Sequence, residues 1–173
     1  HFGHLMLAEW AADALSLEQV WVMPTGFSYC KAEQSMPDGE ERLKMVQLAV
    51  EDNPRLCCKD TEVRRKGATY TYETMEQLKE QFPDTEFYFI TGADCLFALE
   101  EWKHPERLLA CCTLVAAVRD ESSMRQMEQK SAELAGRFGG SILVLPFARL
   151  SVTSTMIRER IAGGQSVRYM VPE

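Results

Sequence analysis

Short, continuously apolar runs alternate with longer amphipathic segments along the chain. An apolar run without polar alternation is typical of a strand buried on both faces, and the amphipathic segments between such strands supply helices that cover the sheet. The pattern therefore predicts an α/β fold, a doubly wound parallel sheet with helices on both faces. Strands are predicted at 20–23, 56–58, 87–90, 113–118 and 142–145, and helices at 1–14, 38–50 (capped by Asp38), 70–82, 122–138 and 155–162.

The order of these elements predicts where a ligand binds. In a doubly wound sheet, ligands bind at the carboxyl ends of strands. Functional residues are therefore expected near Pro24, Gly92, Arg119 and Pro146. Because such a domain normally opens with a strand and this chain opens with a helical pattern, we expect residues 1–173 to form one domain that is incomplete at its N-terminus.

Composition and charge exclude several classes of protein. The chain has 173 residues, of which 46% are hydrophobic and 26% charged, and these are ordinary values for a globular domain. Nineteen basic against 26 acidic residues give a formal net charge of −7, which argues against nucleic-acid binding through bulk charge and leaves a local anion site open. No apolar run reaches the roughly 18 residues of a membrane-spanning helix, so no membrane association is expected.

The six cysteines raise the question of disulfides. Four of them form two adjacent pairs (57–58 and 111–112), two stand alone, and no CxxC motif occurs. Cysteines beside apolar residues without metal-ligand spacing are typical of free thiols in a reducing compartment. We therefore expect free thiols and a cytoplasmic location.

Two histidines lie three residues apart at the start of the chain, in His1-Phe2-Gly3-His4. This spacing places both imidazoles on one face of a helix, near its N-terminus, where they can bind phosphate oxygens. Gly3 would let a ligand approach the backbone. The alternatives are a remnant of an affinity tag for His1 and an ordinary surface histidine for His4. A metal site would need further ligands, and the only other histidine is His104.

Hydroxyl residues precede the last predicted helix, in a segment that runs from Ser151 to Arg158. Serine and threonine are common helix caps. Arg158, however, falls in the first turn, where the helix dipole disfavours a cation unless an anion is bound. The hydroxyls of Ser154 and Thr155 can join Arg158 on a phosphate. The alternative for Arg158 is a surface pair with Glu159.

Four further positions are candidates, and each has a structural alternative. Asp94, after the most apolar strand, can accept from a ribose hydroxyl or cap a helix. Lys31, in the loop after the first strand, can reach a phosphate or remain solvated. Trp102 can stack on a planar ligand or cover the core. The segment 67–71 supplies hydroxyls to a small substrate or starts a helix.

The histidine pair and the Ser/Thr-Arg segment together resemble the HxGH nucleotidyltransferase superfamily, whose members carry His-x-Gly-His early and a Ser-Thr-x-Ile-Arg-type motif late. GxxxxGK[ST], GxGxxG and GxSxG motifs are absent. Three further segments narrow the resemblance to bacterial nicotinate-nucleotide adenylyltransferases: 67–74 (GATYTYET), 89–94 (FITGAD) followed by Trp102, and 167–172 (VRYMVP).

The chain departs from this family's pattern at three places. The family's first strand and Gly-Gly-x-Phe-Asp-Pro turn are absent. Its Pro-Pro-His-Lys loop is represented by residues 28–31 (SYCK), which keep only the lysine, and the aromatic residue that usually follows the tryptophan is Lys103.

The resemblance implies a Rossmann-like nucleotidyltransferase fold and transfer of the adenylyl group of ATP to nicotinate mononucleotide, which gives deamido-NAD and pyrophosphate. It implies Mg²⁺ bound mainly through substrate phosphates, with no metal ligands from the protein. The alternatives are a sibling adenylyltransferase for nicotinamide mononucleotide or phosphopantetheine, and a non-catalytic nucleotide-binding module. The partners implied are these small molecules, and a homo-oligomer is compatible with the sequence.

The resemblance also assigns roles to individual residues. The catalytic residues are His4, His1, Lys31 and Arg158. The ATP-binding residues are His1, Gly3, His4, Gly92, Asp94, Arg119, Ser154, Thr155 and Arg158, and the residues that bind the mononucleotide are Thr71, Tyr70 and Trp102.

Overall fold

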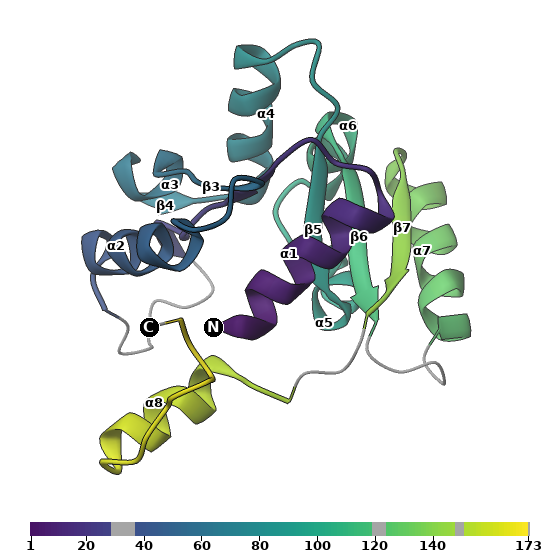
Figure 1. Ribbon diagram of the computed structural model, residues 1–173. Helices are drawn as coiled ribbons and strands as arrows, with labels where there is room; N and C mark the ends of the chain where they lie inside the picture. The colour runs from purple at the N-terminus through teal and green to yellow at the C-terminus, as the bar shows by residue number, and fades with distance from the viewer. Residues whose placement is uncertain (29–36, 119–123, 148–150, 173) are drawn as a thin grey trace. The chain divides into compact units, whose positions relative to one another are not determined.

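The computed structural model describes residues 1–28, 37–118, 124–147 and 151–172 (Figure 1). The chain divides into two compact units. The first unit comprises His1–Phe27, Glu33–Lys66 and Arg149–Glu173, and the second comprises Ser28–Ala32 and Gly67–Ala148.

The first unit is built around a short parallel strand pair. Strand β1 (Val20–Val22) pairs with β3 (Leu56–Cys58), with Val20 opposite Leu56. Helix α1 (Phe2–Ala14) packs on β1, and α2 (Gly39–Val50) packs on β3. The unit also contains α3 (Thr61–Arg64) and α8 (Ser154–Ala162), and the two-residue strand β2 (Phe27–Ser28) falls on its boundary.

One capping bond and one set of ion pairs fix helices of the first unit. The side chain of Asp38 accepts a hydrogen bond from the backbone N–H of Glu41 at 2.8 Å, so the predicted cap of α2 is confirmed. Arg55, which immediately precedes β3, forms ion pairs with Glu9 and Asp13 on α1. The ion pairs of Arg55 tie α1 to the strand pair. They therefore orient the helix at whose start the two histidines lie.

The second unit contains a three-stranded parallel sheet in the order β5 (Tyr88–Gly92), β6 (Thr113–Val118), β7 (Ile142–Pro146) (Figure 1). Helix α5 (Ala93–Phe97) packs against β5 and β6, and α7 (Met124–Phe138) packs against β7. Helix α4 (Thr71–Gln81) packs against α6 (Pro105–Cys111). The strand β4 (Ala68–Thr69) and the 3-10 helix η2 (Leu99–Glu101) complete this unit.

The sequence predicts burial on both faces for each of its five strands, and among these β6 alone has it. Residues Leu114–Val118 are all buried, whereas β5 is half-buried throughout and Leu143 on β7 is 41% exposed. The cause is position in the sheet. Strand β6 has a hydrogen-bonded neighbour on each side, and β5 and β7 each have one in this sheet.

The carboxyl ends of the three strands lie at one edge of the sheet. The register sets Gly92 opposite Ala117 and Val118 opposite Pro146, as expected for parallel strands. The predicted boundary after Ile90 is wrong, because β5 continues through Thr91 and Gly92 and α5 begins directly at Ala93. The small-residue segment is therefore the strand end itself, with Gly92 as the cap residue of the following helix.

Sequence periodicity missed the shortest elements. Helices α3, α5 and α6 and the 3-10 helix η2 have 3 to 7 residues, too few for a periodic apolar stripe. Pro105 at the first position of α6 was the available signal.

The described cysteines are free thiols, as the sequence analysis predicts. Cys57, Cys58, Cys95, Cys111 and Cys112 are free thiols, and Cys30 lies outside the described residues. Burial raises the pKa of the Cys112 thiol to about 12. No helix in the described part of the chain is long and apolar enough to cross a membrane.

We predict that Gly140→Ala destabilises the protein by about 2–3 kcal/mol, because both backbone conformation and space require glycine. Gly140 has φ +78°, and a β-carbon there would lie 2.4 Å from the carbonyl oxygen of Leu109. Gly136→Ala in α7 is the matched control, since a β-carbon there would meet no atom within 4 Å apart from the neighbouring backbone of its own helix. Urea unfolding measures both variants, and equal midpoints would contradict the prediction.

Candidate active site

The two motif histidines stack on each other at the start of α1. Their ring centroids are 3.9 Å apart with an interplanar angle of 19°. His1 is the N-cap residue of α1 and makes no side-chain capping bond, and His4 is exposed. The predicted placement of both imidazoles on one face, at a helix N-terminus, is confirmed.

Gly3 makes this stacking possible and also marks a close approach by a distant segment. A β-carbon at position 3 would lie 3.0 Å from ring atoms of His1 and 3.7 Å from the carbonyl oxygen of Val152. A side chain there would require the His1 ring to shift by a few tenths of an ångström. The Nδ1 atom of His1 is buried and has no hydrogen-bond partner among the described residues.

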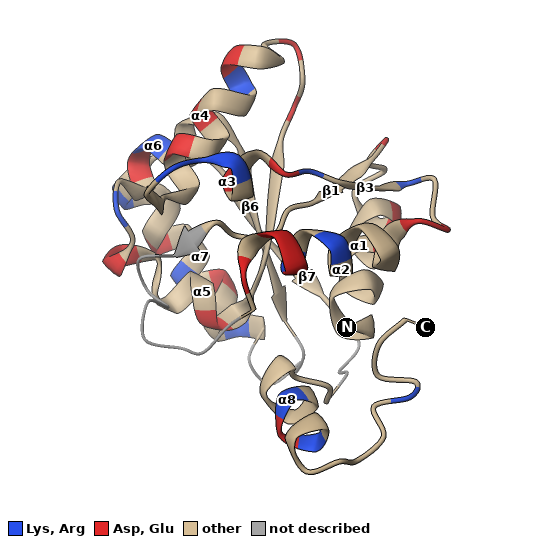
Figure 2. Ribbon diagram, turned by 90° about the vertical axis from the view of Figure 1, so that its left-hand side faces the viewer, with Lys and Arg blue, Asp and Glu red and all other residues tan. Residues whose placement is uncertain are grey.

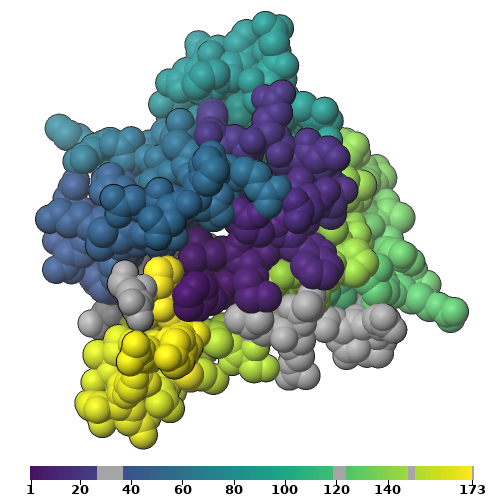
Figure 3. All heavy atoms as spheres, in the orientation of Figure 1, coloured from purple at the N-terminus to yellow at the C-terminus, as the bar shows by residue number. Residues whose placement is uncertain are grey.

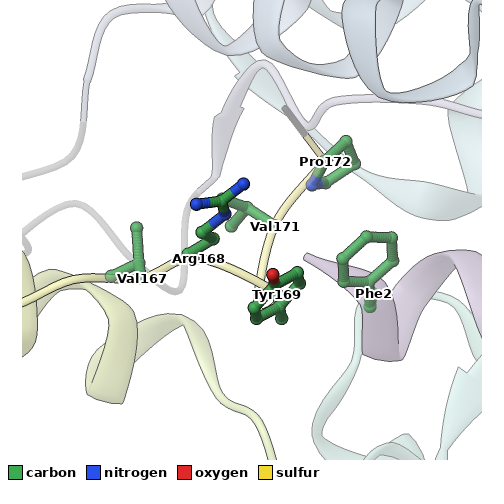
Figure 4. Close-up of a pocket in the computed structure, with 6 residues that line it drawn as sticks. All are labelled: Phe2, Val167, Arg168, Tyr169, Val171 and Pro172. Atoms are coloured by element: carbon green, nitrogen blue, oxygen red, sulfur yellow. The ribbon is translucent and has the colours of Figure 1, made fainter.

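The C-terminal segment also meets the first turn of α1. The backbone N–H of Phe2 donates to the carbonyl of Met170 at 3.1 Å, and Figure 3 shows the purple start of the chain beside the yellow end. A pocket of about 370 Å³ opens at this junction (Figure 4). In Figure 4 Phe2 faces the other lining residues, which are Val167, Arg168, Tyr169, Val171 and Pro172.

The hydroxyl-rich segment caps α8 as its composition predicts. Thr153 is the N-cap, and its Oγ1 accepts from the backbone N–H of Met156 at 3.1 Å. Arg158 donates to Oγ1 of Thr155 at 3.3 Å, so the alternative pairing with Glu159 is not the arrangement found. Figure 2 shows acidic and basic residues together on α8. Ser154 and Thr155 are exposed in the first turn, and Arg158 is exposed as the fifth residue of α8, just beyond the first turn in which the sequence predicted it, because the helix begins at Ser154 and not at Thr155.

Arg42 binds the backbone on both sides of residues 29–36, which the structure does not describe. Lys31 itself lies outside the described residues. The guanidinium of Arg42 donates to the carbonyls of Thr25 and Gly26 on one side and to that of Pro37, at 3.2 Å, on the other. Sequence reasoning missed Arg42, because no local pattern indicates a contact across this separation.

In the second unit, Gly92 and Asp94 stand at the carboxyl end of β5. Asp94 is exposed in the first turn of α5, where a carboxylate suits the helix dipole. Arg119, which follows the end of β6, lies outside the described residues.

The predicted ring-binding residues lie on the same unit. Tyr70 is the N-cap residue of α4 and Thr71 its first residue. Trp102 is half-buried and packs edge-on against Phe89 of β5, with centroids 6.1 Å apart at 80°. The tryptophan therefore contacts the sheet without being fully buried.

Within the described residues, no group of three or more histidine, cysteine, aspartate or glutamate side chains is arranged to hold a metal ion. The side chains at the start of α1 and α8 include two imidazoles and a guanidinium, which are groups that can donate hydrogen bonds to an anion.

Comparison with known families defines the class of protein. A model of the cytidylyltransferase-like family matches residues 1–160, and the chain belongs to that family. Two similar relatives of the chain are named for one activity within this family. The chain is 42% identical over its full length to a probable nicotinate-nucleotide adenylyltransferase of Lachnoclostridium phytofermentans, covering 86% of that relative. It is 35% identical to the probable nicotinate-nucleotide adenylyltransferase of Geobacillus thermodenitrificans, covering all of this chain and 74% of the relative. The resemblance drawn from the motifs is confirmed.

Solved structures agree on the fold. The nicotinic acid mononucleotide adenylyltransferase of Plasmodium falciparum complexed with NaAD superposes with a TM-score of 0.75 at 17% identity, over 98% of this chain and 82% of that one. The same enzyme complexed with APC gives a TM-score of 0.68 at 15% identity, over 98% and 81% of the two chains. The predicted Rossmann-like α/β fold class is therefore confirmed.

Proposed function

We propose that this chain transfers the adenylyl group of ATP to nicotinate mononucleotide, forming deamido-NAD and pyrophosphate. The observation that carries the proposal is the approach of Val152 to Gly3. It brings the start of α8 and the stacked histidines into one small region of the first unit. The full-length similarity to nicotinate-nucleotide adenylyltransferases supports the same activity.

The reaction needs positioned charge and no activated side chain. A phosphate oxygen of the mononucleotide, already anionic at neutral pH, attacks the α-phosphorus of ATP in line. A new P–O bond forms, the bond to the β-phosphate oxygen breaks, and pyrophosphate leaves with that electron pair. Rate acceleration then comes from alignment and from donors aimed at the developing charge.

The first unit supplies the phosphate-binding groups in this proposal. His4 donates to the α-phosphoryl oxygens in transfer, and His1 to neighbouring phosphate oxygens. A ring nitrogen of His1 that is buried, with no partner in the part of the chain that the structure describes, supports a ligand contact at this side chain. Lys31, Arg158, Ser154 and Thr155 hold the departing pyrophosphate, aided by the N–H groups at the start of α8.

Mg²⁺ is assigned to the substrate phosphates. The ion prefers oxygen ligands, loses water reluctantly and is commonly held through phosphates, so a site of imidazole, hydroxyl and guanidinium groups fits an ion that arrives with ATP. When bound, it neutralises phosphate charge. We assign no protein ligand to it.

The second unit supplies the groups for the nucleosides. Gly92 and Asp94 hold adenosine through its ribose, and Arg119 contacts the nucleotide. Thr71 and Tyr70 bind the nicotinate ring by hydrogen bonding, and Trp102 stacks on it. The incomplete burial of Trp102 supports this role. We assign both units to one nucleotidyltransferase domain, because the family match at 1–160 extends over both.

The activity is tested by following pyrophosphate release and dinucleotide formation with ATP and each of three acceptors. Nicotinate mononucleotide is expected to have the highest kcat/KM, above nicotinamide mononucleotide and phosphopantetheine. ATP binding without pyrophosphate release from any acceptor would instead identify a non-catalytic nucleotide-binding module.

We predict that His4→Ala lowers kcat by about 10²- to 10³-fold, the loss typical when one charge-stabilising donor is removed. Met6→Ala, an exposed position on the same helix, is the control and should keep normal turnover. Steady-state kinetics measures both variants, and near-normal kcat in the His4 variant would remove the catalytic assignment.

We predict that Trp102→Ala raises the KM for nicotinate mononucleotide by about tenfold, because the variant loses a stacking interaction at the upper end of the usual range. The KM for ATP should rise less than about twofold. Trp102→Phe keeps a stacking ring and should restore most of the affinity. Thermal unfolding of each variant corrects for the lost packing on Phe89. An equal rise in both KM values would show that the ring does not bind the mononucleotide.

A further inference from the structure

A lysine stands beside the residues that we assign to the nicotinate ring. Lys103 directly follows Trp102, and its Nζ lies 4.8 Å from the ring centroid of Tyr70. Tyr70 in turn precedes Thr71 at the start of α4. The Lys103 ammonium thus belongs to the residue after Trp102 and lies over Tyr70, the residue before Thr71.

The backbone between η2 and α6 explains this placement. Trp102 is extended (φ −72°, ψ 151°), whereas His104 adopts a left-handed conformation (φ 52°, ψ 56°) before Pro105 starts α6. The chain therefore changes direction within two residues. The indole contacts Phe89 on β5, and the next side chain reaches the start of α4.

Two neighbouring basic side chains already have carboxylate partners. Arg107 lies over the ring of Tyr72 and donates two hydrogen bonds to Glu76, at 2.7 and 2.6 Å. Nδ1 of His104 lies 3.1 Å from Oε1 of Glu106.

Lys103 differs from these two residues. Its ammonium lies over an aromatic face, and it forms no ion pair with any residue that the structure describes. An aromatic face positions a cation without neutralising it. The Lys103 charge therefore stays available to an anionic group.

We propose that the ammonium of Lys103 binds the ring carboxylate of nicotinate mononucleotide and makes the enzyme prefer the acid to the amide, an inference that rests on the proposed function. The two mononucleotides share ribose and phosphate and differ at this ring substituent. The carboxylate is anionic at neutral pH and accepts from an ammonium. The amide is neutral and directs N–H groups as well as an oxygen at the same cation.

Lys103→Met tests the proposal, because it removes the charge and keeps most of the side-chain volume. The value of kcat/KM for nicotinate mononucleotide is expected to fall about tenfold. This is the loss of one charge-assisted hydrogen bond, reduced because the site is exposed to solvent. The value for nicotinamide mononucleotide is expected to change less than about twofold, since a neutral ring loses no ion pair. Lys103→Arg keeps the charge and should keep most of the acid preference.

Lys44→Met is the matched control, because it makes the same change in net charge at an exposed position on α2. It should leave the acid-to-amide ratio unchanged. Three results would overturn the proposal: an unchanged ratio in Lys103→Met, an equal loss with both mononucleotides, or an arginine variant that behaves like the methionine variant. Failure of the proposed function is distinguishable, because the unmutated protein would then release no pyrophosphate with nicotinate mononucleotide.

Discussion

The approach of the segment before α8 to the first turn of α1 is the constraint on which the proposed chemistry depends. Gly3 lacks a side chain, so the His1 ring can lie over its backbone and stack on His4, with the Val152 carbonyl close by. About 150 residues of sequence separate the two segments, yet they share one region of the first unit. Charge stabilisation of a triphosphate requires such convergence, because donors act only at hydrogen-bond distance.

Local charge, and not the charge of the whole chain, determines what this region binds. The chain carries a net charge of −7, so long-range attraction of a polyanion is unfavourable. In the proposed function, imidazoles, a guanidinium and helix N–H groups at the start of α1 and α8 donate to the substrate phosphates. Near Tyr70 and Tyr72, individual contacts also matter more than net charge. Glu76 pairs with Arg107 and Glu106 contacts His104, whereas Lys103 lies over Tyr70 and is left for a ligand in our proposal.

Much of the local structure could be predicted from the sequence, and the long-range contacts could not. The continuous apolar run at 113–118 gives β6 with correct bounds, and Asp38 caps α2 as its spacing indicates. Both features depend on neighbours within a few residues. The hydrogen bonds of Arg42 and the position of Lys103 over Tyr70 join residues 5 to 33 positions apart, and no periodic pattern records them. The motifs indicated the candidate residues. The approach of Val152 to Gly3 could not be predicted from them, because it appears only in the folded chain.

A double-mutant cycle between His4 and Arg158 tests the central claim most directly. Single-turnover rates of adenylyl transfer are measured for the unmutated protein, His4→Ala, Arg158→Ala and the double variant. If both side chains act on one triphosphate, the loss in the double variant is smaller than the product of the single losses by about tenfold or more. Losses that multiply within about twofold would show independent action and contradict the account.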